Sequence, residues 1–328
     1  MDNDKTSRRK FVQRTAALAG GAFALGLTPA SAAAPPQASS NAASPLSKTQ
    51  KLRALLRRPG LLHAPEAYNV LAAKLAEYHG FEAIYIGGNM MSAIYLGLPD
   101  WGMISNIEMI EIAGRIAREV SIPAIVDADE AGETSLNVYR AVQQYEKAGI
   151  AALHIEDTLL PKLPRAEREK LTPDDPIGVS SIERMVLRIR AALDARSDPD
   201  FVIIARTVEQ DIDAVIRRGK AYAEAGANVF MNGLSGMSAE QIDRIGREVP
   251  IPLLGIGVPL ANRGTQLKVN IYANLVSGPA SALCDTILRE LKDRGEVARR
   301  PALAENIAAQ LKNQAALAQL ATKWAATP

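Results

Sequence analysis

Short apolar runs alternate with amphipathic segments along most of this chain. Eight mostly apolar runs recur, at residues 61–64, 83–88, 124–129, 152–157, 201–207, 228–233, 253–257 and 268–273. Segments with apolar positions at helical spacing lie between them, at residues 67–78, 107–119, 136–148, 182–195, 212–225 and 239–248. Strands that alternate with crossover helices over about 250 residues are typical of a parallel sheet.

Eight strand–helix units favour one closed architecture, a (β/α)8 TIM barrel of the α/β class. The alternative is a doubly wound open sheet, but no Gly-x-Gly-x-x-Gly motif follows the first run. In the seventh unit only residues 258–267 separate two strands. We therefore expect the crossover in that unit to be short or irregular.

The first 32 residues differ from the rest of the chain. Arg8 and Arg9 precede an apolar stretch at residues 16–27, and Ala30 and Ala32 are the small residues of a cleavage site. This order is typical of a twin-arginine signal peptide, so we expect an exported, periplasmic or secreted protein. The alternative is a basic disordered tail. A membrane-spanning helix needs about 20 apolar residues, so we expect no permanent membrane anchor.

Three further segments complete the predicted organisation. Residues 33–50, rich in Ala, Pro and Ser, are predicted to be a flexible linker. Residues 51–298 would form the barrel, and residues 299–328 an additional helical segment. A helix beyond the eighth unit needs another surface for its apolar stripe. We expect it to serve oligomerisation, the alternative being that it packs under its own barrel.

Charge and cysteine content exclude several classes of protein. The 328 residues include 38 Lys+Arg and 36 Asp+Glu; without the leader, which holds five bases and two acids, 33 bases face 34 acids. That balance does not suit a nucleic-acid-binding protein. Cys284 is the only cysteine, so an internal disulfide and a structural zinc site are excluded.

Carboxylates gather where the predicted strands end. Asp127 and Asp129 end the third run, Glu156 ends the fourth, and Asp100 follows the second. In such a barrel the strand ends form the active-site mouth. Converging carboxylates without His or Cys select a hard cation, so we predict Mg²⁺ or Mn²⁺ as cofactor. The alternative is that these acids cap helices or pair with surface bases.

Two other features point to an anionic substrate. Arg206 ends the fifth run, and its guanidinium suits a carboxylate or phosphonate. Gly87, Gly88 and Asn89 end the second run, where backbone N–H groups can approach an anion.

The connection at residues 158–178 is long and charged, and is predicted to be a lid over the mouth. A solvated surface loop is the alternative.

These motifs resemble those of the isocitrate lyase and phosphoenolpyruvate mutase superfamily, over residues 52–292. The matching motifs are Tyr85-Ile86-Gly87-Gly88, Gly97-Leu98-Pro99-Asp100, Val126-Asp127-Ala128-Asp129, His154-Ile155-Glu156-Asp157, Pro161-Lys162, and Ala205-Arg206-Thr207. The resemblance implies a β/α barrel, a mobile loop after the fourth strand and a homotetramer, a dimer of dimers. It implies that Asp129 binds Mg²⁺ directly and that Asp127, Asp100 and Glu156 hold its waters.

The remaining predicted site residues fall into two groups. Lys162, Arg206 and Glu156 would be catalytic. The residues that would bind the substrate are Tyr85, Gly87, Gly88, Asn89, Arg206 and Asn232. Asn232 stands where the family usually has a glutamate.

The gating loop departs from the family pattern. Related lyases carry Lys-Arg-Cys-Gly-His there, whereas this chain has Lys162-Leu163-Pro164-Arg165-Ala166, without thiol or imidazole. The resemblance still implies a Mg²⁺-dependent lyase that cleaves a C–C bond of a small 2-oxo or 2-hydroxy dicarboxylate through a metal-held enolate. Decarboxylation suits the missing thiol better than isocitrate cleavage does. The alternatives are a phosphonopyruvate-type P–C mutase or hydrolase and a non-catalytic carboxylate-binding barrel.

Overall fold

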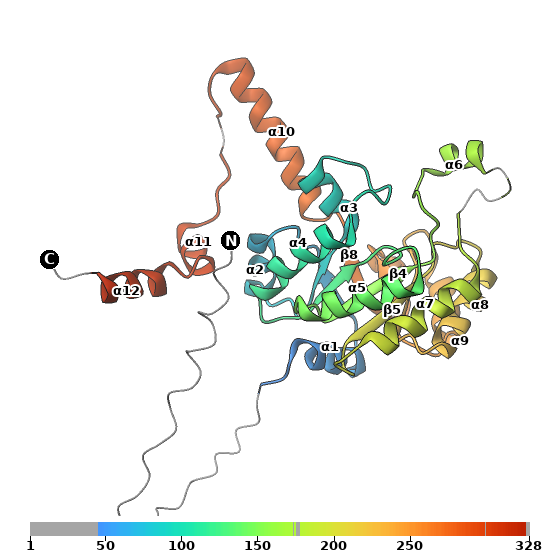
Figure 1. The fold of residues 1–328 in the computed structure, drawn as a ribbon. Coiled ribbons are helices and arrows are strands. Elements are labelled where there is room, and N and C mark those ends of the chain that lie inside the picture. Colours follow the sequence, from blue (N-terminus) through green and yellow to red (C-terminus); the bar gives the residue numbers. More distant parts are fainter. Residues whose placement is uncertain (1–44, 173, 175–177, 299, 326–328) are drawn as a thin grey trace, which may run out of the picture. The chain divides into compact units, whose positions relative to one another are not determined.

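Eight parallel strands form a single sheet in the computed structural model, which describes residues 45–172, 174, 178–298 and 300–325 (Figure 1). The strands are β1 (Leu62–Pro65), β2 (Ile84–Ile86), β3 (Ala124–Asp127), β4 (Ala152–Glu156), β5 (Val202–Arg206), β6 (Val229–Met231), β7 (Leu253–Ile256) and β8 (Leu267–Tyr272). The predicted signal peptide, residues 1–32, and linker residues 33–44 lie outside the described residues.

The sheet closes on itself. Its order is β1-β8-β7-β6-β5-β4-β3-β2, so the first and last strands pair. At the seam between β1 and β2, Glu66 forms a parallel bridge with Tyr85, and the Ala67 N–H donates to the Tyr85 carbonyl at 2.8 Å. The predicted TIM barrel is therefore confirmed, and the doubly wound alternative is wrong.

Helices cover the outside of the barrel between successive strands. The crossover helices are α2 (Val70–Tyr78), α4 (Asn106–Arg118), α5 (Ser135–Lys147), α7 (Ile182–Ala195), α8 (Ile212–Glu224) and α9 (Ala239–Glu248). Capping boxes begin α4 at Ser105 and α5 at Thr134. The seventh crossover contains only a 3₁₀ turn, η2 (Leu260–Asn262), as its shortness predicts. Shorter elements after the second and fourth strands are α3 (Gly88–Met91), the π-helix η1 (Ser92–Leu96) and α6 (Arg165–Leu171).

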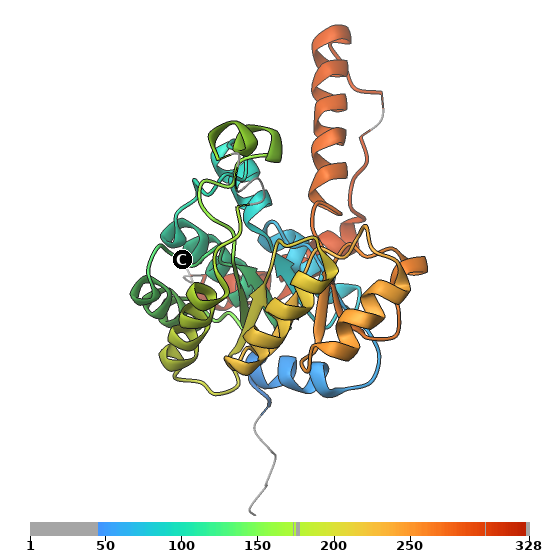
Figure 2. The same ribbon diagram turned by 90° about the vertical axis from the view of Figure 1, so that its right-hand side faces the viewer.

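A helix closes the floor of the barrel, opposite the mouth. This helix, α1 (Lys48–Arg57), begins inside the predicted linker, so the linker prediction is wrong for residues 48–50. Leu52 packs with apolar side chains from the barrel interior. Arg53 donates to the Asp200 carbonyl at 3.1 Å and to Asn228 Oδ1 at 3.0 Å. Figure 2 shows α1 at the lower end of the barrel.

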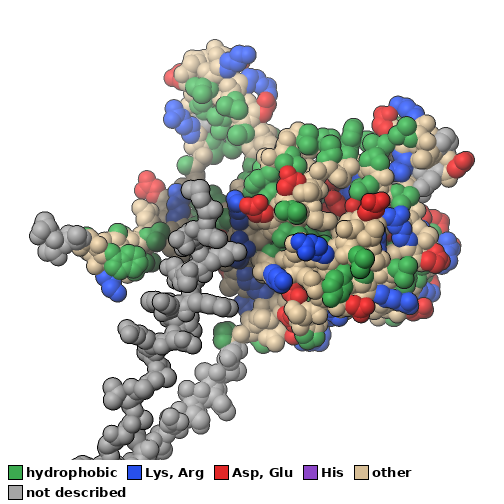
Figure 3. Space-filling view, viewed as in Figure 1, with side chains coloured by type: hydrophobic (Ala, Val, Ile, Leu, Met, Phe, Trp, Pro, Cys, Tyr) green, Lys and Arg blue, Asp and Glu red, His purple; other side chains and the backbone are tan. Residues whose placement is uncertain are grey.

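The C-terminal part consists of α10 (Ser277–Arg294), α11 (Glu305–Leu311) and α12 (Gln314–Trp324). The helical stretch predicted at its end is interrupted at Asn313, which has φ +53°. Apolar side chains are exposed on α10 and α12, including Leu288 and Trp324 (Figure 3). Among the described residues, no helix combines the length and apolar character needed to cross a membrane.

Candidate active site

Parallel register brings the predicted acids and arginine together at the mouth of the barrel. Asp127 on β3 pairs in register with His154 on β4, and Glu156 with Arg206 on β5. Arg206 Nη1 lies 2.8 Å from Glu156 Oε2 and 3.9 Å from Asp127 Oδ2. The strand ends thus supply a guanidinium between two buried carboxylates.

Asp129 reaches the same cluster through an unusual backbone conformation. Its φ of +50° lies in the left-handed region, which Asp tolerates better than most residues. Its N–H donates to Asp127 Oδ1 at 3.0 Å. A Cβ on Gly88 would come within 3.3 Å of Asp127 Oδ2 and 3.5 Å of Asp129 Oδ1, so the missing side chain permits this close approach.

Lys162, from the segment after β4, occupies the centre of the cluster. Its ammonium donates to Asp129 Oδ1 and lies 2.8 Å from Glu156 Oε1, and the side chain is only 11% exposed. Its backbone N–H donates to the Trp101 carbonyl at 3.3 Å. This segment therefore contacts both the mouth and the loop after η1.

A buried tyrosine and histidine support Asp127 from below. The Tyr85 hydroxyl lies 3.2 Å from His154 Nε2 and 3.5 Å from Asp127 Oδ2, and the two rings stack. His154 Nδ1 lies 3.5 Å from Asp127 Oδ1. Burial lowers the pKa of His154 to about 4, so the imidazole is neutral at pH 7. The pair therefore positions Asp127.

The carboxylates differ in their affinity for protons. Burial, together with the charge of Asp127, raises the pKa of Asp129 to about 8. Burial also raises the pKa of Asp100. Although burial acts against the charged form, His154, Lys162 and Arg206 hold the pKa of Asp127 well below its usual range. The acids likewise raise the pKa of Lys162, against the effect of burial. The Lys162 ammonium is therefore positively charged in the site. Of the carboxylates beside it, Asp127 is ionised and Asp129 binds a proton more readily.

Lys162 lies among the carboxylates that are predicted to bind a metal ion. No group of three or more His, Cys, Asp or Glu side chains in the described ranges is arranged to hold a metal ion. The donor set nevertheless fits a divalent cation. Four carboxylates, including Asp100, interact with the two positive charges of Lys162 and Arg206, so carboxylates outnumber bases in the cluster. Within the described part of the chain, Asp100 Oδ1 is also buried without a hydrogen-bond partner.

The other predicted residues lie around this cluster with different roles. The Gly88 N–H donates to Asp127 Oδ2 at 3.3 Å, and Gly87 caps α3 beside the Tyr85 ring. Asn89 is exposed on α3. The Asn232 side-chain amide donates to the carbonyls of Thr207 and Glu209, both at 3.0 Å. Asn232 thus holds the loop after β5 and, with Arg206, lines a pocket of about 460 Å³ at the mouth.

One residue that the sequence analysis did not single out organises the segment after β4. Arg168 on α6 is buried, and its guanidinium donates to the Leu159 carbonyl at 2.7 Å and to that of Pro161. A Cβ on Gly178 would come within 2.4 Å of the guanidinium carbon. The only signal in the sequence is an arginine three residues after Arg165, which by itself has no distinctive spacing.

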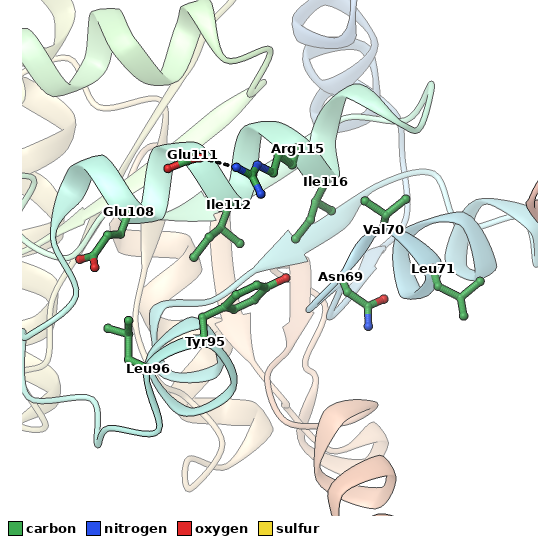
Figure 4. Close-up of a pocket in the computed structure, with 10 residues that line it drawn as sticks. All are labelled: Asn69, Val70, Leu71, Tyr95, Leu96, Glu108, Glu111, Ile112, Arg115 and Ile116. Carbon is green, nitrogen blue, oxygen red and sulfur yellow. Dashed lines mark hydrogen bonds and ion pairs between the residues drawn. The ribbon is translucent and has the colours of Figure 1, made fainter.

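A second pocket lies away from this chemistry. A groove of about 570 Å³ between α2, η1 and α4 contains none of the predicted site residues (Figure 4). The ion pair drawn there joins Glu111 to Arg115 on α4. The acid and base groups gather at the mouth instead, so the mouth is the candidate active site.

Comparison with known proteins agrees with this geometry. Residues 52–273 match the phosphoenolpyruvate phosphomutase family. The chain belongs to this family. The 2,3-dimethylmalate lyase of Eubacterium barkeri is 38% identical over 218 residues, which are 65% of this chain and 70% of that protein. The oxaloacetate decarboxylase of Ectopseudomonas mendocina (strain ymp) is also 38% identical, over 67% of this chain and 77% of that protein.

Solved structures place the fold in the same superfamily. A phosphonopyruvate hydrolase in complex with oxalate and Mg²⁺ superposes with a TM-score of 0.74 at 28% identity, covering 85% of this chain and 99% of that one. A 2,3-dimethylmalate lyase described as a member of the PEP mutase/isocitrate lyase superfamily superposes with a TM-score of 0.72 at 25% identity, covering 86% of this chain and 99% of that one. This member of the family is an enzyme of the lyase class.

Proposed function

We propose that this family member cleaves a C–C bond next to a 2-oxo acid, with decarboxylation of a small 2-oxo dicarboxylate such as oxaloacetate as its reaction. The observation that carries this proposal is the cluster of Asp127, Asp129 and Glu156 around Lys162 and Arg206. Relatives named oxaloacetate decarboxylase and 2,3-dimethylmalate lyase support it.

The side chains of the mouth divide the work of binding. Arg206 would receive a substrate carboxylate, because its planar fork is held by Glu156 and lines the mouth pocket. Asp129, Asp127, Glu156 and Asp100 would hold Mg²⁺ or Mn²⁺. Such a cation, when bound, supplies a Lewis acid toward the 2-oxo group. Lys162 would face the same end of the substrate with a second positive charge.

Decarboxylation needs little acid–base help from the protein. The bond to the departing carboxylate breaks, CO₂ leaves, and the electron pair stays on the substrate as an enolate. Lys162 and Arg206 would stabilise that negative charge in a site where both side chains are mostly buried. A later protonation, by water, completes the product. No thiol is required, in keeping with Leu163 and Pro164 following Lys162.

The test is an assay of the protein without its leader, supplemented with Mg²⁺, on oxaloacetate, 2-methylisocitrate, dimethylmalate and phosphonopyruvate. We expect pyruvate from oxaloacetate, and loss of that activity in Arg206→Gln. Phosphate release from phosphonopyruvate would instead favour P–C chemistry, for which the solved hydrolase is a precedent. No turnover of any of the four would overturn the proposed substrate class.

We also propose that the protein is exported and assembles as a dimer of dimers. The paired arginines and cleavage-site residues of the first 32 residues support export. The exposed leucines of α10 support assembly; Leu288, for example, is 62% exposed. Apolar side chains that face water add no stability to a helix, whereas contact with another subunit would bury them.

A further inference from the structure

Lys162 uses the same oxygens that a bound cation would need. Its ammonium contacts Asp129 Oδ1 and Glu156 Oε1, while Arg206 contacts the other oxygen of Glu156. Lysine supplies donors and one positive charge but no acceptor, so it cannot itself become a metal ligand here while protonated. We propose that the Lys162 ammonium and a divalent cation are alternative partners of Asp129 and Glu156, so that cation binding releases Lys162. This inference rests on the metal dependence proposed above.

Geometry and charge make the two arrangements exclusive. A Mg²⁺ ion lies about 2.1 Å from its oxygen ligands and demands a nearly octahedral shell. An ammonium within hydrogen-bond distance of Asp129 Oδ1, on the carboxylate expected to bind the ion directly, would stand inside that shell. The two groups also repel each other, and a site this enclosed screens that repulsion weakly. The cation therefore replaces the ammonium rather than joining it.

Release of the Lys162 ammonium would also affect residues 159–162 and the segments that contact their backbone. The Lys162 N–H donates to the Trp101 carbonyl, and the Arg168 guanidinium donates to the carbonyls of Leu159 and Pro161. Residues 159–162 are thus held between α6 and the loop at Trp101. A cation alone would loosen this packing. A carboxylate ligand that binds after the cation would give the Lys162 ammonium a new anionic partner and so restore the packing of residues 159–162.

Chemical labelling tests the displacement without any substitution. Acetic anhydride modifies accessible amines, and mass spectrometry would follow Lys162 with Lys170 as internal control, because Lys170 lies on α6 with a 70% exposed side chain. We expect saturating Mg²⁺ to raise acetylation of Lys162 at least fivefold and leave Lys170 unchanged. Addition of oxalate with Mg²⁺ should lower it again. Unchanged labelling of Lys162 at a Mg²⁺ concentration shown by calorimetry to be saturating would overturn the inference.

Binding measurements separate this inference from the metal proposal itself. Lys162→Gln should bind Mn²⁺ at least tenfold more tightly than the parent protein in an electron paramagnetic resonance titration, whereas Lys162→Arg and Lys170→Gln should match the parent. Equal affinity in Lys162→Gln and the parent would refute displacement and leave the metal site standing. Absence of Mn²⁺ binding in every variant, with or without oxalate, would overturn both. Circular dichroism confirms that each variant is folded.

Discussion

The side chain of Leu160 lies directly over Gly102. A Cβ on Gly102 would come within 2.4 Å of Leu160 Cδ2, and Gly102 has φ +78°. The residue before Gly102 is Trp101, whose carbonyl accepts the N–H of Lys162. The loop after η1 and the segment after β4 are therefore packed together at a point where only glycine fits.

Gly102→Ala should weaken substrate binding. Alanine there meets both an unfavourable φ, which costs about 1–2 kcal/mol, and the Leu160 side chain. Gly97 offers a matched control, because it has φ +66° and, apart from its own chain neighbours, no described residue comes within 4 Å of the place that a Cβ would take. We expect Gly97→Ala to lose stability in urea unfolding through its φ alone and Gly102→Ala to lose more, because of the added contact with Leu160. Only Gly102→Ala should raise KM or the Kd for oxalate, about tenfold. Equal KM values in the two variants would show that the contact has no role in binding.

Arg168→Lys should disturb the mouth without unfolding the barrel. Lysine cannot bridge two carbonyls as the guanidinium does, and a hydrogen bond from a charged group contributes about 1.5–3 kcal/mol. We expect kcat/KM to fall at least tenfold while Tm changes by only a few degrees. Lys170→Gln, on the exposed side of α6, should behave like the parent protein. A full activity in Arg168→Lys would mean that the segment holds its position by other contacts.

The fold was largely predictable from the sequence, for a physical reason. Strands that are buried on both faces must be apolar. The eight strands therefore stand out in the sequence as short apolar runs, distinct from the surface segments between them. The interruption at Asn313 and the start of α1 at Lys48 were not predictable, because both depend on local dihedral angles or on distant partners such as Asp198.

From residue patterns alone the site was predictable where strand register fixes it, and Lys162 was assigned to the site through the family resemblance. Glu156 and Arg206 are adjacent because β4 and β5 are parallel and in register. The contacts of Lys162 and Arg168 arise from the path of a connection, which no periodicity encodes. The hydrogen bonds of Asn232 to two carbonyls depend likewise on the conformation of the loop after β5.

Acid should destabilise the protein partly through His154. A histidine with a pKa near 6.5 when unfolded and about 4 when folded binds its proton more tightly in the unfolded chain. Its contribution to stability is complete above pH 6.5 and is lost as the pH falls toward 4. Between pH 7 and 5 this group alone should lower the free energy of unfolding by about 2 kcal/mol.

Urea unfolding at several pH values isolates that contribution. His154→Gln should show a pH dependence flatter by that amount, although it is less stable at pH 7. His79→Gln, at the exposed end of α2, is the matched histidine substitution to compare with it. If His154→Gln and the parent have parallel curves, the imidazole is not the group that titrates.

The export prediction concerns residues 8 and 9. Replacing both Arg8 and Arg9 by Lys should retain the precursor in the cytoplasm, because the export machinery recognises the arginine pair and not its charge. Cell fractionation and immunoblotting would follow the protein, with Lys10→Arg as a control that leaves the pair intact. Normal export of the double variant would refute the assignment of the route.

The attachment of α1 to the floor of the barrel has a consequence for the order of folding. Thr49 donates a hydrogen bond to Asp198 at 2.7 Å, and Arg53 binds Asn228, so its partners are 149 and 175 residues away in the chain. Contacts so distant in sequence form slowly. During synthesis, the first helix must wait until the fifth and sixth strands have emerged. Nascent chains that end before Asp198 should therefore leave α1 open to proteases, and chains that extend past Asn228 should protect it.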